Sequence, residues 1–256
     1  MISKMNILAK GALVLAVTSL SMSAQAQGIK DLINNTKKAV TGVAAGKTGS
    51  GTGTKSLTEG EITSGLKEAL KVGTQNATGR LSSVNGFFGN QLIKILMPPE
   101  AKKIETTLRS LGMGAQVDKA ILSMNRAAED ASGKAVPIFV DAITGITIQD
   151  GLSILRGSND AATQYLKGRT TASLTTAFRP VIEKSLAKVQ ATKYWSEIVT
   201  IYNKLPTTRQ KMNPDLTAYV TERALSGIFV NIADEEGKIR TNPAARVSDI
   251  LRKVFG

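Results

Sequence analysis

The chain has 256 residues, 42% hydrophobic and 4% aromatic, and a formal net charge of +13. It contains no histidine and no cysteine. This excludes Ser-His-Asp and Cys-His catalysis, disulfides, imidazole or thiolate metal sites and lipid attachment to a cysteine. No Gly-x4-Gly-Lys-Ser/Thr loop is present, and no Gly-x-Gly-x-x-Gly follows a strand pattern. Any catalysis would have to use carboxylate, Lys, Tyr, Ser or Thr groups.

The first 26 residues have the pattern of a secretory signal. Lys4 and Lys10 charge its start, residues 11–22 form an apolar run, and Ala24-Gln25-Ala26 has the small-x-small cleavage pattern. The run is short for a membrane span, and no other long uncharged apolar segment follows. We therefore predict cleavage near Ala26 and export to the periplasm or beyond, with no transmembrane segment in the mature chain. An uncleaved anchor is the alternative.

Residues 27–56 are expected to form a short N-terminal segment and a flexible linker. Five glycines lie between residues 42 and 53 among Thr, Ser and Ala, a composition that cannot bury a core. Residues 57–256 are long enough for one domain with a single core. Without residues 1–26 the net charge would be +11, of which +4 belongs to residues 27–56 and +7 to the domain.

Apolar residues recur at helical spacing through almost all of residues 57–256, and no run alternates apolar and polar side chains over six residues. We predict an all-α fold, a single compact bundle of about nine to eleven short helices. Thr58 and Glu61 form a capping box at its start, and Asn213-Pro214 and Asn242-Pro243 each look like an N-cap followed by proline. The predicted apolar stripes are 62–70, 88–96, 101–111, 117–128, 136–143, 174–189, 194–205, 225–232 and 247–254.

Residues 146–178 hold several helix boundaries in a short space. Thr147 and Asp150 form a capping-box variant, and Gly157 is expected to end that helix in the left-handed conformation. Ser158 or Asn159 would cap a second helix, with Asp160 in its first turn. Gly168 would end the second helix, and Thr170 or Thr171 would begin a third. Pro180 predicts a kink or break in that one.

Such tight corners would bring a set of polar residues towards one region. One interpretation is that they are caps and surface ion pairs. The other is a ligand pocket with an aspartate and two arginines at its mouth, because the guanidinium fork suits carboxylate or phosphate. The candidate ligand-binding residues are Arg156, Asn159, Asp160, Gln164, Tyr165, Arg169 and Thr170.

A second polar group is Asn125, Arg126 and Glu129. Arg126 lies opposite the main apolar stripe of a helix that is apolar on two sides, so it should be partly buried and need a carboxylate partner. We favour a structural ion pair with Glu129 or Asp130 over a secondary ligand site. The acidic run at residues 234–236 is interpreted as a solvated helix end, because consecutive helical side chains diverge by about 100°.

Several segments resemble one bacterial family. They are Ser123–Glu129, Phe139–Ile143, Asn159–Tyr165, Tyr219–Glu222, Asn242–Arg246 and Leu251–Gly256. Over residues 57–256 the chain is similar to the exported proteins grouped as domain-of-unknown-function family 4197. The resemblance implies an exported helical domain without an assigned activity, and it carries no functional residue with it.

The excess of basic over acidic residues favours anionic partners. Basic residues are scattered and aromatics are few, so no specific nucleic-acid binding is expected. Tyr194, Trp195 and Tyr202 form either part of the core or a sugar-binding face. The leading prediction is a non-enzymatic periplasmic ligand-binding or protein-interaction module without catalytic residues, metal or cofactor. The alternative is a basic peripheral protein on anionic envelope lipid or polysaccharide, and a hydrolase using Asp, Tyr or Lys is a third hypothesis.

Overall fold

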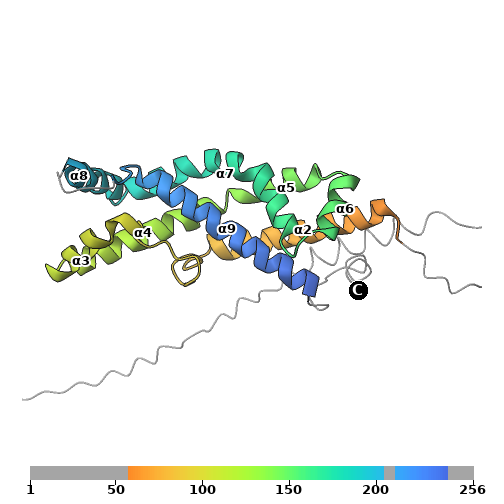
Figure 1. Cartoon of the computed structure of the whole chain (residues 1–256), viewed down its shortest axis with the longest axis horizontal. Coiled ribbons are helices and arrows are strands. Elements are labelled where there is room, and N and C mark those ends of the chain that lie inside the picture. Colours follow the sequence, from red (N-terminus) through yellow and green to blue (C-terminus); the bar gives the residue numbers. More distant parts are fainter. Residues whose placement is uncertain (1–56, 205–210, 242–256) are drawn as a thin grey trace, which may run out of the picture. The chain divides into compact units, whose positions relative to one another are not determined.

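A computed structural model describes residues 57–204 and 211–241 of the chain. Within these ranges every regular element is helical, which confirms the predicted all-α class. Figure 1 shows the arrangement of these helices. The predicted signal (1–26), the linker segment (27–56) and the terminal helix expected after Asn242 lie outside the described residues.

The described part of the chain contains eight α-helices and one 3₁₀ turn. Two predicted helices merge in α7 and the helix predicted around residues 88–96 is absent, so this part of the chain has fewer helices than predicted. Their bounds are α2 Glu59–Ser82, η1 Pro99–Ala101, α3 Lys102–Ser110, α4 Gly114–Ser132, α5 Ala135–Thr144, α6 Ile148–Arg156, α7 Ala161–Ala187, α8 Ala191–Lys204 and α9 Leu216–Thr241.

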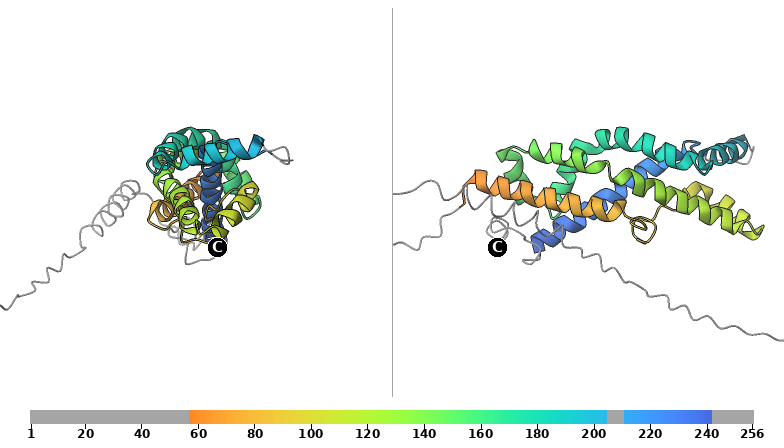
Figure 2. Two further views of the ribbon diagram at one scale, coloured as in Figure 1. Left: turned by 90° about the vertical axis from the view of Figure 1, so that its left-hand side faces the viewer. Right: turned by 180° about the vertical axis from the view of Figure 1, so that it is seen from behind.

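The core lies between the four long helices α2, α4, α7 and α9. Helix α7 packs along α4 and α9, and α2 packs against α9, α4 and the shorter α5 and α6 (Figures 1 and 2). Phe139 of α5 meets Phe229 of α9 edge to face, with ring centroids 6.1 Å apart. The capping box predicted for Thr58 and Glu61 starts α2, and the buried stripe predicted for α9, from Leu225 to Ile232, is confirmed.

Helix α7 runs without interruption through Gly168 and Pro180. The predicted helix end at Gly168 and helix start at Thr170 or Thr171 are therefore wrong, and the helix does not break at Pro180. Its buried side chains recur every four residues: Leu166, Thr170, Leu174, Phe178, Ile182 and Leu186. Packing of this stripe on α4 and α9 offsets the helix-propensity costs of about 1 kcal/mol for glycine and about 3 kcal/mol for proline. Tertiary contact therefore decides the length of the helix.

The segment between α2 and η1 is not helical, although the spacing of its apolar residues predicts a helix there. Residues 83–98 form successive turns that bury Phe87, Ile93 and Ile95. Leu92, expected in the buried stripe, is 86% exposed, and Leu96 is also exposed. The apolar spacing does not produce a helix here because the backbone of this loop forms hydrogen bonds with side chains of α4, as described below.

Two further boundaries differ from prediction. Helix α9 is capped by Asp215, whose carboxylate accepts from the Ala218 N–H at 2.9 Å, and Asn213 instead accepts from the Asp215 N–H. Gly157 has φ −79°, so the expected left-handed conformation is wrong. Position 157 has no room for a side chain, because a Cβ there would lie 2.6 Å from the Cβ of Ala161.

No single helix among the described residues is long and apolar enough to cross a membrane. Helices α5 and α6 reach that length and hydropathy only when taken together, and they are bent by 105° at their junction.

Two glycines of α9 give a test of core packing. A Cβ at Gly227 would lie 2.5 Å from the ring of the fully buried Phe87, whereas a Cβ at Gly237 would meet no heavy atom within 4 Å. Gly227→Ala should lower the free energy of unfolding by about 1–3 kcal/mol through overpacking. Gly237→Ala should raise it by up to about 1 kcal/mol through helix propensity. Urea denaturation followed by circular dichroism measures both, and equal effects of the same sign would contradict this packing.

Candidate functional site

The corner between α6 and α7 begins with the predicted capping box, which the structure confirms. The N–H of Thr147 donates to the Asp150 carboxylate at 3.0 Å, and the N–H of Asp150 donates to the Thr147 hydroxyl at 3.1 Å. The bonds from the Thr147 N–H and hydroxyl lower the pKa of Asp150, and the more distant charge of Arg169 adds a smaller effect in the same direction. Both bonds of the box that starts helix α6 lie within residues 147–150.

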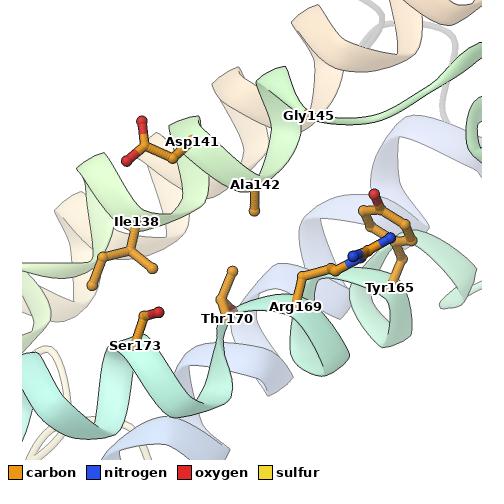
Figure 3. A pocket seen from close by; sticks show the side chains of 8 residues that line it. All are labelled: Ile138, Asp141, Ala142, Gly145, Tyr165, Arg169, Thr170 and Ser173. Carbon is orange, nitrogen blue, oxygen red and sulfur yellow. The ribbon is translucent and has the colours of Figure 1, made fainter.

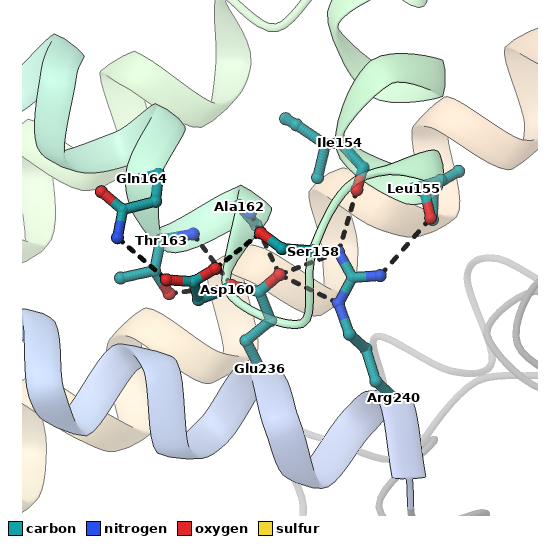
Figure 4. A network of polar contacts seen from close by, with 9 residues as sticks. All are labelled: Ile154, Leu155, Ser158, Asp160, Ala162, Thr163, Gln164, Glu236 and Arg240. Carbon is teal, nitrogen blue, oxygen red and sulfur yellow. Dashed lines mark hydrogen bonds and ion pairs between the residues drawn. The ribbon is translucent and has the colours of Figure 1, made fainter.

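The start of α7 is capped by a residue from another helix. Glu236 of α9 accepts from the backbone N–H groups of Ala162 and Thr163 at 3.0 and 2.9 Å, and from the Thr163 hydroxyl at 2.8 Å (Figure 4). The predicted caps Ser158 and Asn159 do not fill this role. Asp160 occupies the cap position, but its side chain makes no capping bond. A carboxylate from α9 therefore satisfies donors that a local cap leaves open.

Arg240, one turn after Glu236, closes the end of α6. Its guanidinium donates to the carbonyl oxygens of Ile154 at 2.9 Å and Leu155 at 3.4 Å, and it pairs with Glu236 at 2.9 Å (Figure 4). The carboxylate thus lies at the positive end of α7 and the cation at the negative end of α6, as the helix dipoles favour. One ion pair joins three helices at this corner.

The interpretation of residues 234–236 as a solvated helix end is wrong for two of the three. Glu235 and Glu236 are buried, and Arg80 of α2 pairs with Glu235 at 3.0 Å. The sequence did carry a signal for Glu236. It continues the spacing of three and four residues set by Leu225, Phe229 and Ile232, so it belongs to the buried face of its helix.

Asp160 bonds to its own neighbours. It accepts from the Ser158 hydroxyl at 2.6 Å and from the Gln164 side-chain amide at 2.9 Å, and these two bonds lower its pKa. Arg156 and Asn159 are exposed on the same corner. These contacts rigidify the turn between the helices.

A shallow groove of about 320 Å³ lies between α5 and α7. Arg169 stacks over the ring of Tyr165, with its guanidinium carbon 5.4 Å from the ring centroid, and the Tyr165 hydroxyl donates to Asp150 at 3.4 Å. Figure 3 shows Arg169, Tyr165 and Thr170 on one wall and Asp141 on the other, with its carboxylate turned away from Arg169. The lining residues are Ile138, Asp141, Ala142, Gly145, Tyr165, Arg169, Thr170 and Ser173.

The seven predicted ligand-binding residues are therefore divided. Tyr165, Arg169 and Thr170 line the groove, whereas Asp160 and Gln164 do not. Arg169 follows Asp160 by nine residues. In a continuous helix this spacing separates the two residues by about 13 Å along the axis and by about two and a half turns, so they lie on opposite faces. The predicted helix end at Gly168 would have folded the chain back and brought the two together.

The second polar group fastens the loop of residues 83–98 to α4. Asn125 accepts from the Ile95 N–H at 2.9 Å and donates to the Ile95 carbonyl at 2.8 Å. Glu129 accepts from the N–H groups of Phe87 and Phe88, both at 3.1 Å.

Arg126 completes this group on the solvent side. Its guanidinium pairs with Glu129 and donates at 2.8 Å to the side-chain oxygen of Asn85, a residue with φ +68°. All three side chains of the second polar group thus serve to hold the loop.

The acidic residues Glu129, Asp130 and Asp160 act in separate contacts. Asp130 accepts from Ser185 of α7 at 2.7 Å, while Glu129 and Asp160 are engaged as described above. Within residues 57–204 and 211–241, no group of three or more Asp, Glu, His or Cys side chains is placed to hold a metal ion.

Comparison with protein families matches residues 56–256 to the family described as protein of unknown function (DUF4197). The chain belongs to this family. The match covers the whole helical region and confirms the resemblance seen in its segments. No curated protein and no solved structure matches the chain.

Removing the carboxylate at the α6–α7 corner should be costly. Glu236→Ala leaves Arg240 without its buried partner and the first N–H groups of α7 without an acceptor. We expect a loss of about 3–5 kcal/mol in the free energy of unfolding, measured by urea denaturation. Asp234→Ala, on the exposed face of the same helix, should change it little. Equal losses in the two variants would contradict the capping role.

The Thr147–Asp150 box should make stability depend on pH. Because folding lowers the pKa of Asp150 from its ordinary value of 3.8, its contribution is complete above that pH and disappears as pH falls through the folded-state value. Asp150→Asn should therefore lower Tm at neutral pH and narrow its difference from the wild type as pH falls below about 4. A difference in Tm that is independent of pH would contradict this account.

Proposed function

We propose that this protein is a non-enzymatic binding module that takes a small anionic group in the groove between α5 and α7. The observation that carries the proposal is Arg169. This exposed arginine lines the groove and is stacked on Tyr165, and it forms no ion pair with a carboxylate in the described part of the chain. A guanidinium positioned over an aromatic ring by a cation–π contact keeps N–H donors for a ligand, and its planar fork suits a carboxylate or phosphate.

The remaining lining fits a ligand of modest size. Ser173 and the Tyr165 hydroxyl add polar groups, and Ile138 and Ala142 supply an apolar wall. A volume of about 320 Å³ is at the lower end of the range for ligand pockets. The groove therefore accommodates a small molecule or the end of a larger chain.

We also propose that the protein acts outside the cytoplasm. The support is the charged start, apolar run and Ala-x-Ala pattern of residues 1–26. In that compartment carboxylate and phosphate groups occur on cell-wall acids, lipid head groups and small metabolites, all of which complement the net charge of the chain.

The test uses inorganic phosphate and acetate as probes. Titration of ¹⁵N-labelled protein should shift the Arg169 side-chain N–H resonance and the backbone resonances around Thr170, and Arg169→Ala should weaken binding roughly tenfold or more. Arg156→Ala is the matched control, since Arg156 is exposed but does not line the groove. If both variants weaken binding equally, attraction is general to the basic surface and the proposed site is wrong.

Asp141 gives a second, independent readout of the same site. Asp141→Asn removes a negative charge from the wall facing Arg169, so it should tighten binding of both probes. A loss of affinity for both probes in Asp141→Asn would show that Asp141 does not repel the bound anion and would contradict the proposed position of the site.

A further inference from the structure

Two helix corners of the domain expose large apolar side chains. At the α3–α4 corner Leu111 is 69% and Met113 is 40% exposed. At the α7–α8 corner Val189 and Tyr194 are each 54% exposed. The neighbouring Trp195 is buried and donates its indole N–H to the Asn213 carbonyl. Of the aromatic residues that could belong to the core, Trp195 is therefore part of it and Tyr194 is not.

The backbone of each corner contains a left-handed residue. Gly112, between Leu111 and Met113, has φ +79°, and Gln190, directly after Val189, has φ +55°. At the α3–α4 corner the N–H of Met113 donates to the Leu108 carbonyl at 2.9 Å and the N–H of Gly112 donates to the Arg109 carbonyl at 3.1 Å, the two bonds of a Schellman cap, in which an apolar residue at the Met113 position is common. Met113 is nevertheless 40% exposed and Leu111 is 69% exposed, so both side chains remain open to a surface outside the domain.

The two corners lie at the same end of the domain. The two side views show α8 and the α3–α4 corner at the same end of the long axis of the domain, at the left in Figure 1 and at the right in the second panel of Figure 2. Helix α3 has no buried residue and packs mainly on α4, with Ile104 and Leu108 partly buried against the core. The corners are therefore positioned to touch one surface together.

Lysines outnumber acidic residues beside the α7–α8 corner. Lys184, Lys188 and Lys193 are all exposed, and the segment that they occupy is bounded by the exposed Glu183 and Glu197. None of the ion pairs among the described residues includes these three lysines. Apolar side chains flanked by unpaired lysines are typical of segments that settle into the head-group region of a membrane.

We propose that this end of the domain docks on an anionic lipid bilayer, with Leu111, Met113, Val189 and Tyr194 inserted shallowly between head groups. The lysines supply attraction to the anionic lipid, and the apolar side chains gain burial once at the surface. Separated protruding corners suit a soft surface, which closes around each of them. A rigid protein partner would need a matching hollow for each corner.

The absence of cysteine in the chain allows the contact to be mapped directly. Met113→Cys and Tyr194→Cys, each labelled with the environment-sensitive dye NBD, report on the two corners. Leu92→Cys is the control, since Leu92 is still more exposed but belongs to the loop of residues 83–98. The protein is the chain from Gln27 onward, because the apolar run of residues 11–22 would itself bind lipid.

On vesicles of phosphatidylglycerol and phosphatidylcholine, both corner labels should shift to the blue and be quenched by spin-labelled lipid. The control label should do neither, and phosphatidylcholine alone should have no effect. Because the labels report position, the basic residues 27–56 can contribute to binding without producing this pattern.

Charge removal tests the electrostatic part. Lys184→Gln, Lys188→Gln and Lys193→Gln combined should weaken partitioning onto the anionic vesicles roughly tenfold to a hundredfold. Circular dichroism should show the variant to be folded.

A matched triple substitution elsewhere completes the comparison. Changing Lys71, Lys134 and Lys167 to Gln removes the same charge from other faces and should have a clearly smaller effect. If the two triple variants weaken partitioning equally, net charge alone binds the vesicle and the proposal is overturned.

Three other outcomes would also overturn the proposal. The corner labels can stay unshifted while the chain binds the vesicles, which would assign binding to another part. They can shift equally on neutral vesicles, which would remove the role of anionic lipid. They can shift without vesicles as protein concentration rises, which would assign the corners to contact between two copies of the chain.

Discussion

The contact between Glu236 and the first N–H groups of α7 determines how the rest of the structure is arranged. Helices α6 and α7 are joined by a turn of only four residues. The last C=O groups of α6 and the first N–H groups of α7 have no partner within their own helices, and burying them without hydrogen bonds would be costly. One turn of α9 satisfies both sets, with Glu236 on α7 and Arg240 on α6. The direction in which α7 leaves the corner follows from this contact, and α7 carries both the groove residues and the corner at its far end.

A similar arrangement recurs at the loop of residues 83–98. Asn125 and Glu129 of α4 bond to its backbone just as Glu236 bonds to the start of α7. In each place an arginine on the same helix pairs with the buried glutamate, Arg126 in one and Arg240 in the other. Within the described ranges, no buried side-chain nitrogen or oxygen lacks a hydrogen-bond partner. The domain thus uses long-range polar caps where local capping sequences are absent.

The features proposed for function differ from these structural polar groups in one respect. Glu129, Glu236 and Asn125 are buried and fully engaged with backbone, so they are committed to holding the fold. Arg169 and the lysines of the α7–α8 corner are exposed, and no described carboxylate pairs with them. A polar group whose bonding capacity is not used within the domain is available to a ligand or a surface.

Local patterns in the sequence were sufficient for the helical class, the capping boxes at Thr58 and Thr147 and the buried stripe of α9. These features depend on residues within one or two turns of one another, so their spacing is visible in the chain itself. The length of α7, the irregular path of residues 83–98 and the partition of the candidate ligand-binding residues could not be read in this way. Each depends on partners 30 or more residues away, such as Asn125 with Ile95 or Glu236 with Ala162. Tertiary structure decided them, because a buried backbone group must bond to whichever partner the fold brings within reach.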